Sequence, residues 1–377
     1  MALSTNDLGI QIRALFLPNA GHLPVITRLT ALLQIKYFGS IDFKESLFFA
    51  NAGWILTTLT LIFYFRRSLA LSWLALLPIP FLMLNINHWE AMDFITPAWQ
   101  MYWGSALLPV LLFIALVEQR ITLAVYAFTA AIFLSSGALP LYPIAIAYCL
   151  FKKRWNDSAS FALRAAIPLL LFFYFNPPSS STNKPLNIAL MFKYIPAFMG
   201  NLVSTGKWDM SNIAWLHITM GLIVIASGLW VLLRAKNADV SKLIFIYVLM
   251  LGGMAAYLRG DGFSYVVSRY ALFASLTITA LYAACITNQQ SMITTRKWGV
   301  PAIVVISMML WLQSIYLCRV PLQINRDGRI DGIKAILDPN STSGNAAALF
   351  GDQTYLNKVI GQSKLLNVYN LNSALQQ

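Results

Sequence analysis

Charged residues are scarce in this chain: Asp, Glu, Lys and Arg together make up 11% of its 377 residues, whereas hydrophobic residues make up 58%. A soluble globular domain usually carries about 25% charged residues. The composition therefore excludes an ordinary water-soluble enzyme and predicts a membrane protein built from apolar helices.

Several signatures of catalysis are absent as well. The three cysteines, Cys149, Cys285 and Cys318, have neither metal-site spacing nor a paired framework, and we interpret them as small apolar core residues. The chain has no Gly-rich phosphate loop with its Lys, no His-Glu-x-x-His motif and no Gly-x-Ser-x-Gly motif. No nucleotide site is visible, and the usual signatures of ATP-driven, zinc and serine-hydrolase chemistry are missing.

What the sequence does contain is a series of ten apolar runs, several of them shorter than the ~20 residues that span a bilayer core. We interpret the chain as an all-α polytopic membrane protein with about ten transmembrane helices. The segment 121–151 is either two short spans or a broken, re-entrant pair around Ser135, Ser136 and Gly137. The ten runs are 47–65, 69–84, 104–117, 121–134, 137–151, 161–175, 213–233, 243–258, 270–287 and 299–317.

Three parts are expected along the chain. Residues 1–46 form an outer N-terminal loop, 47–317 the transmembrane bundle, and 318–377 a small outer (periplasmic) tail that docks on the outer loops. Apolar residues from Leu23 to Leu33 recur at helical spacing and predict a helix on the membrane surface, and 187–202 predicts a second interfacial helix. Because the first clear span comes late, we expect a membrane helix upstream of this chain.

The net charge of +13 would suit a nucleic-acid partner, but its distribution indicates a lipid bilayer instead. With the N-terminus outside, basic residues concentrate in the cytoplasmic loops, as the positive-inside rule requires. This predicts a multi-pass membrane protein whose N-terminus and polar stretches face the outer side. The cytoplasmic loops hold 12 basic residues (Arg66, Arg67, Arg120, Lys152, Lys153, Arg154, Arg164, Arg234, Lys236, Lys242, Arg296, Lys297), the short outer loops 5 (Lys184, Lys193, Lys207, Arg259, Arg269) and the tails the other 10 of 27.

Four polar stretches should surface on the outer side: 6–22, 87–93, 207–209 and 259–270. Charge kept at one face of a many-span protein is costly and usually functional. In the first stretch, Asp7 is either a catalytic base or cation ligand, or simply a helix N-cap. His22 either bonds a phosphate or sugar hydroxyl, or is a solvated interfacial side chain.

The second stretch lies in a predicted outer loop, 85–103, that is rich in aromatic residues. These rings are either an interfacial belt or a wall that stacks sugar rings. His88, Glu90 and Asp93 in the same loop keep the sugar-binding interpretation open, with Trp89 as a candidate ring.

The fourth stretch holds two candidate anion anchors, Arg259 and Arg269, because a guanidinium donates to phosphate oxygens as a planar fork. Alternatively, each Arg reaches lipid headgroups or pairs with Asp261. Tyr270 either contributes to the site or belongs to the interfacial belt.

Two of these stretches carry a resemblance. Asn19-Ala-Gly-His-Leu-Pro24 with Arg28, and Leu258-Arg-Gly260 with Ser268-Arg-Tyr270, resemble the first and late outer loops of bacterial membrane proteins similar to the GT-C superfamily of glycosyltransferases. The resemblance covers most of 6–290 through short motifs. It implies transfer of a sugar from a polyprenyl-phosphate carrier to a cell-surface glycan or lipid on the outer face. It also implies a location in the bacterial inner membrane, with the active site facing the periplasm.

The resemblance places the superfamily's first-loop acid on Asp7 and its lipid-phosphate Arg on Arg259 or Arg269. Two departures are visible: the usual span before the acid is absent, and Asn6 stands where a second acid is usual. The second departure argues against a metal site, although a divalent cation stays open as a cofactor. The competing interpretations are a flippase or transporter of a polysaccharide precursor, a polysaccharide polymerase and a non-enzymatic assembly partner. Inverted repeats with broken helices would favour a transporter.

Overall fold

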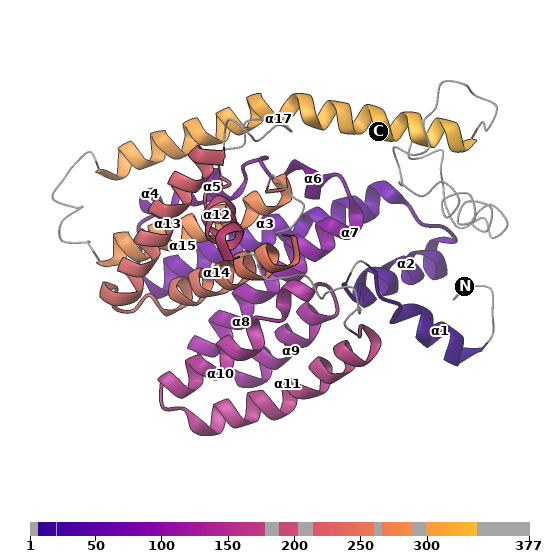
Figure 1. The fold of residues 1–377 in the computed structure, drawn as a ribbon, viewed down its shortest axis with the longest axis horizontal. Helices are drawn as coiled ribbons and strands as arrows, with labels where there is room; N and C mark the ends of the chain where they lie inside the picture. The colour runs from indigo at the N-terminus through magenta and orange to yellow at the C-terminus, as the bar shows by residue number, and fades with distance from the viewer. Residues whose placement is uncertain are drawn as a thin grey trace.

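The computed structural model describes residues 7–19, 21–177, 188–202, 214–259, 266–288 and 299–337. In these ranges the secondary structure is helical and no strand forms. Asn19 and His22 make an isolated antiparallel β-bridge. The predicted all-α architecture is confirmed for the described part of the chain (Figure 1).

Seven stretches among the described residues are long and apolar enough to cross a membrane. The central ones are the most enclosed. In an apolar stretch of 18 residues, 78% of the residues are buried in η4–α15, against 11% in α17. The seven are α3 (Phe43–Ser68), the continuous α7–η1–α8 run (Ile95–Ala98, Trp99–Leu107 and Leu108–Val117), α11 (Trp155–Phe175), α13 (Ala214–Arg234), α14 (Asp239–Arg259), η4 with α15 (Ser268–Tyr270 and Ala271–Asn288) and α17 (Gly299–Leu337).

Three further apolar helical segments are too short to count as spans: Trp73–Met83, Ile121–Ile132 and Ser136–Phe151. Together with the seven long ones they match the ten runs in the sequence, whereas ten complete spans stay a prediction. The three segments contain α4 (Trp73–Leu76) with α5 (Pro78–Met83), α9 (Ile121–Ile132), and η2 (Ser136–Ala138) with α10 (Leu141–Phe151).

The helix is interrupted around Ser135–Gly137, because α9 ends at Ile132 and α10 begins at Leu141. This interruption fits both alternatives for 121–151, two short spans and a re-entrant pair. Tyr247 of α14 holds this break in place: its hydroxyl shares its single proton between the carbonyl oxygens of Ser105 (3.1 Å) and Gly137 (3.0 Å). Backbone without helical partners is thereby satisfied inside the bundle, as a membrane protein requires.

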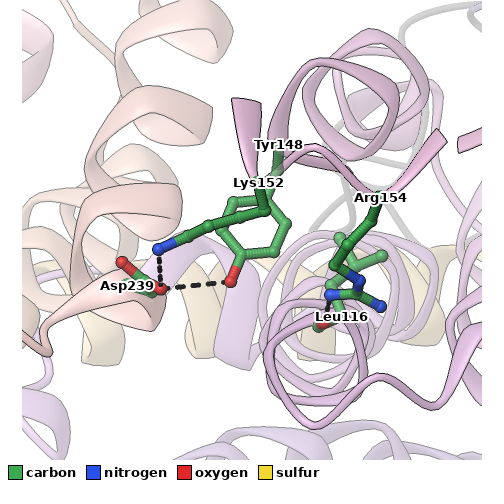
Figure 2. Close-up of polar contacts among 5 residues, drawn as sticks. All are labelled: Leu116, Tyr148, Lys152, Arg154 and Asp239. Carbon is green, nitrogen blue, oxygen red and sulfur yellow. Dashed lines mark hydrogen bonds and ion pairs between the residues drawn. The ribbon is translucent and has the colours of Figure 1, made fainter. Parts of the chain in front are cut away.

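One end of the bundle, which we call the basic end, gathers the loops predicted to be cytoplasmic. Lys152 Nζ lies 2.8 Å from Asp239 Oδ2, and the Tyr148 hydroxyl donates to the same oxygen at 3.1 Å (Figure 2). Arg154 donates to the Leu116 carbonyl at 2.7 Å. These contacts tie α10, α14 and the end of α8 together, so three loops that the sequence assigned to one side do meet at one end.

The two other acids of the basic end are also paired. Glu118 lies 3.3 Å from Arg120, and Asp157 lies 2.6 Å from Arg154. Like Asp239, both acids therefore stand beside basic side chains.

Two boundaries differ from the sequence-based expectation. The α7–η1–α8 helix starts at Ile95, so Trp99, Tyr102 and Trp103 lie within a candidate span and not in an outer loop. The predicted division between 317 and 318 falls inside α17, which continues as one helix to Leu337. The apolar run ends near 317, but helix geometry can continue into polar sequence where side chains find partners.

At the chain's start, α1 (Leu8–Leu15) precedes α2 (Val25–Phe38), which begins after Pro24 as the apolar spacing predicted. The Phe16 ring after α1 stacks on Phe175 at a 4.5 Å centroid distance. The N-terminal segment therefore packs against the end of α11. A helix is also confirmed within 187–202, as α12 (Ile188–Met199).

Candidate functional site at the polar loop

Opposite the basic end, residues 84–93 connect α5 to α7 and include the short helix α6 (Trp89–Met92). We call this segment the polar loop. Its backbone is satisfied by distant side chains: Trp311 donates to the Leu84 carbonyl (2.9 Å), and the Ile86 amide donates to Ser314 Oγ (3.2 Å). Buried backbone groups that lack helical partners need such bonds, so the loop has a defined conformation.

Two amide side chains extend this network into the bundle. Asn85 is 2% exposed and donates to Ser275 Oγ of α15 at 2.7 Å. Asn87 is 5% exposed; its amide side chain donates to the Leu202 carbonyl, and its backbone amide donates to Asn85 Oδ1 at 3.2 Å. The loop therefore places a compact polar layer inside an otherwise apolar bundle.

His88 lies at the centre of this layer. Its ring is fully buried, its Nδ1 lies 2.8 Å from the Tyr102 hydroxyl, and the Trp54 ring meets it edge-on at 4.7 Å. Its Nε2 has no hydrogen-bond partner among the described residues. Burial lowers the pKa of His88 far below its usual value, so the imidazole is neutral.

A carboxylate and a guanidinium-bearing residue meet next to this layer. The Arg269 backbone amide of η4 donates to Glu90 Oε2 of α6 at 3.4 Å, a contact between residues 179 positions apart in the chain. The Arg269 guanidinium lies over the Tyr270 ring at 5.8 Å, and Tyr270 is 9% exposed. The structure thus brings together three residues that the sequence singled out in two separate stretches.

Asp93 follows α6 and is half-buried. Its Oδ2 accepts a hydrogen bond from Asn325 Nδ2 of α17 at 2.8 Å. Asn51 of α3 donates to the neighbouring Met92 carbonyl at 3.0 Å. Two helices far apart in the sequence, α3 and α17, therefore fix the far end of the polar loop.

Trp89 is 5% exposed, so its ring packs into the protein interior. In this conformation Trp89 therefore does not form part of an exposed wall on which sugar rings could stack. The aromatic rings of Trp54 and Tyr102 contact the His88 ring and stack on each other with their centroids 5.9 Å apart.

The N-terminal candidates lie apart from this group. Asp7 caps α1: its Oδ1 accepts from the amides of Gly9 (2.7 Å) and Ile10 (3.3 Å). His22 Nδ1 accepts from the Ser136 backbone amide at 3.0 Å and so anchors the N-terminal segment to the helix break. Figure 1 shows α1 at the edge of the molecule, well away from α6.

Some predicted positions cannot be placed. Asp261 and the stretch 207–209 lie outside the described residues, and Arg259 is the last residue of α14, with a side chain that is not described. Among the residues that the structure describes, no group of three or more His, Cys, Asp and Glu side chains gathers as a metal site would require.

Sequence reasoning overlooked Asn85 as a structural polar group and Asn325 as a partner of the loop. One signal was present, because Asn85-Ile-Asn-His88 places three polar side chains within four residues between two apolar runs. Polar residues at such positions must find partners inside the protein.

Comparison with known proteins adds no family. Neither the models of known families, nor curated proteins, nor solved structures gave a match to this chain.

Proposed function

We propose that this protein is an integral membrane glycosyltransferase that transfers a sugar from a polyprenyl-phosphate carrier to a cell-surface glycan or lipid. The observation that carries the proposal is the meeting of Glu90 with Arg269 beside the buried polar loop. A transferase of this kind needs a carboxylate near a cation at one end of the bundle, and needs no nucleotide site.

The proposed step uses both groups. Glu90 accepts the proton of the acceptor hydroxyl, whose oxygen attacks the anomeric carbon of the sugar. The bond from that carbon to the phosphate oxygen breaks, and its electron pair leaves with the polyprenyl phosphate. The guanidinium of Arg269 binds the phosphate and stabilises the charge that develops on it.

The structure changes which acid we favour as the base. Asp7 Oδ1 already accepts two backbone amides at the start of α1, which is the N-cap alternative of the sequence interpretation. Glu90 lies one turn before Asp93, so both carboxylates belong to the α6 region. We therefore assign the proton-accepting role to Glu90, with Asp7 as the alternative that the same assay compares.

The proposed setting is the bacterial inner membrane, with the polar loop at the periplasmic side. Support comes from Lys152 and Arg154 at the opposite, basic end. The segment Trp73–Met83 is also short: at ~1.5 Å per residue it covers about 17 Å of a ~30 Å core. The polar loop then lies below the membrane surface, within reach of a phosphate at headgroup depth.

A second candidate is a flippase of lipid-linked precursors. The observation that favours it is the pair of interruptions, one at the polar loop and one at Ser135–Gly137, because transporters often bind substrate at broken helices.

The test uses purified protein in liposomes made with lipid extract from cells that lack it, so that the natural donor and acceptor can accumulate. A transferase releases free polyprenyl phosphate, measured by mass spectrometry, and Glu90→Gln slows that release. If Asp7→Asn slows release and Glu90→Gln does not, the assignment of the base is wrong. If wild-type protein moves lipid-linked sugar across the bilayer without releasing polyprenyl phosphate, the flippase is correct.

A further inference from the structure

The helix α17 contacts the polar loop through a single polar stripe. Trp311, Ser314, Cys318 and Asn325 contact Leu84, Ile86, Asn87 and Asp93, in the same order along both segments. At ~100° per residue these four side chains fall within about 60° of arc on the helix. One face of α17 therefore follows the polar loop from end to end.

The opposite face of α17 is apolar and exposed. Met309 (62%), Leu312 (51%), Tyr316 (64%) and Val320 (53%) project away from the stripe. In a bilayer this face contacts lipid, which is as apolar as the side chains, so apolar burial holds such a helix only weakly. The hydrogen bonds of the polar stripe, with ring packing such as Trp311 against Phe81 at 5.9 Å, are what specify its position.

Figure 1 shows the consequence for the whole bundle. α17 runs along one side of the molecule, and it packs against α5, α6 and α4. It is also the least buried of the seven candidate spans. The helix that follows the polar loop from end to end is thus the candidate span with the smallest buried share.

We propose that α17 is a strap whose docking sets the conformation of the polar loop, and that Asn325 is a positioning residue that orients the Asp93 carboxylate. Docking itself does not depend on the reaction, whereas the effect on transfer rests on the proposed function. Because Asn325 Nδ2 donates to Asp93 Oδ2, a change at either residue alters both strap and site.

A native reporter of docking is available. Cys318 is 0% exposed and its Sγ lies 3.5 Å from Asn87 Oδ1, so a docked strap shields it from thiol reagents. In a Cys149→Ala, Cys285→Ala background, the rate at which a water-soluble maleimide labels Cys318 measures undocking of α17.

Asn325→Asp removes the donor and places a like charge beside Asp93, so we expect labelling of Cys318 to rise about tenfold, the scale of one charged hydrogen bond. Ser314→Ala, which leaves the Ile86 amide without its acceptor, should act in the same direction. The matched control is Gln323→Asp, which adds the same charge at an exposed position two residues away and should change nothing.

The reciprocal exchange Asp93→Asn with Asn325→Asp decides the outcome. It rebuilds the amide–carboxylate pair with reversed roles, so labelling should return to within about twofold of wild type. A general loss of folding would not be reversed by the exchange.

Two results would overturn the inference: Cys318 that stays protected in both Asn325→Asp and Ser314→Ala, or an exchange that fails to restore protection. Labelling needs no substrate. Absence of polyprenyl phosphate release by the wild-type protein would therefore refute the proposed function while the docking result stands.

Discussion

At the residue scale, the site is defined by groups whose partners lie far away in the sequence. Glu90 accepts from the amide of Arg269, and His88 shares a hydrogen bond with Tyr102 inside a span. Each of these polar groups is costly in an apolar bundle unless it is paired. Their accumulation at one loop is what makes this end of the molecule the candidate for chemistry.

Arg269→Ala should lower the rate of polyprenyl phosphate release at least tenfold while the amount of folded protein stays the same. The backbone amide that bonds Glu90 remains, so the loss reports on the guanidinium and its phosphate. Lys193→Ala is the matched control, because Lys193 is exposed on α12. Equal rates for the Arg269 variant and wild type would remove Arg269 from the site.

His88 should make stability depend on pH. Its pKa is lowered by burial in the folded protein, whereas in the unfolded chain it is near 6.5, so only the unfolded state takes up the proton as the pH falls below that value. Stability is then lost at about 1.4 kcal/mol per pH unit below ~6.5.

The measurement is the melting temperature of wild type and His88→Gln in detergent at about pH 7.5 and about pH 5. The variant keeps an amide that can bond Tyr102 but loses the titrating ring. Its melting temperature should therefore be lower than that of wild type at the higher pH, and should decrease less when the pH is lowered. Equal decreases in the melting temperatures of the two proteins would contradict a buried neutral His88.

At the element scale, helices and their order follow from the sequence, because apolar runs and helix caps are local signals. Asp42 shows this: it caps α3 by accepting from the amide of Lys44 at 2.8 Å, where the first clear apolar run begins. The partners of the polar loop could not be predicted the same way. Asn325 reaches Asp93 across 232 positions, and no local pattern encodes such a distance.

Element packing also depends on glycines where two backbones meet. A Cβ on Gly221 of α13 would overlap the Pro196 carbonyl oxygen of α12, whereas a Cβ on Gly253 of α14 would meet nothing within 4 Å. Small residues let membrane helices approach this closely.

Gly221→Ala should therefore separate α12 from α13 and lower the free energy of unfolding by about 1–3 kcal/mol or more, the cost of an overpacked core. The melting temperature should fall strongly as a result. Gly253→Ala is the matched substitution and should be neutral or slightly stabilising, since Ala favours helix. A tolerated Gly221→Ala would mean that the two helices do not touch as described.

At the scale of the whole molecule, the two ends of the bundle differ in chemistry. The basic end joins α10 to α14 through Lys152 and Asp239, and the opposite end carries the polar loop. The sequence predicted this division through the positive-inside rule. It could not predict that the polar stretches would separate into the α6–η4 group and the N-terminal segment, which only packing decides.

Single cysteines at two positions test the orientation of the bundle. Lys153→Cys at the basic end should react with an impermeant thiol reagent only after the membrane is opened. Lys36→Cys, exposed at the end of α2 in the predicted outer segment, should react in intact cells, in a background without native cysteines. Labelling of Lys153→Cys in intact cells would invert the proposed topology.

The central claim is that the end carrying Glu90 and Arg269 transfers a sugar from a lipid carrier. The most direct measurement is the mass of surface glycans from cells that lack the protein, complemented with wild type, Arg269→Ala or Lys193→Ala. We expect loss of one sugar unit, restored by wild type and by Lys193→Ala but not by Arg269→Ala. Glycans of unchanged mass together with accumulated lipid-linked precursor would contradict the transferase.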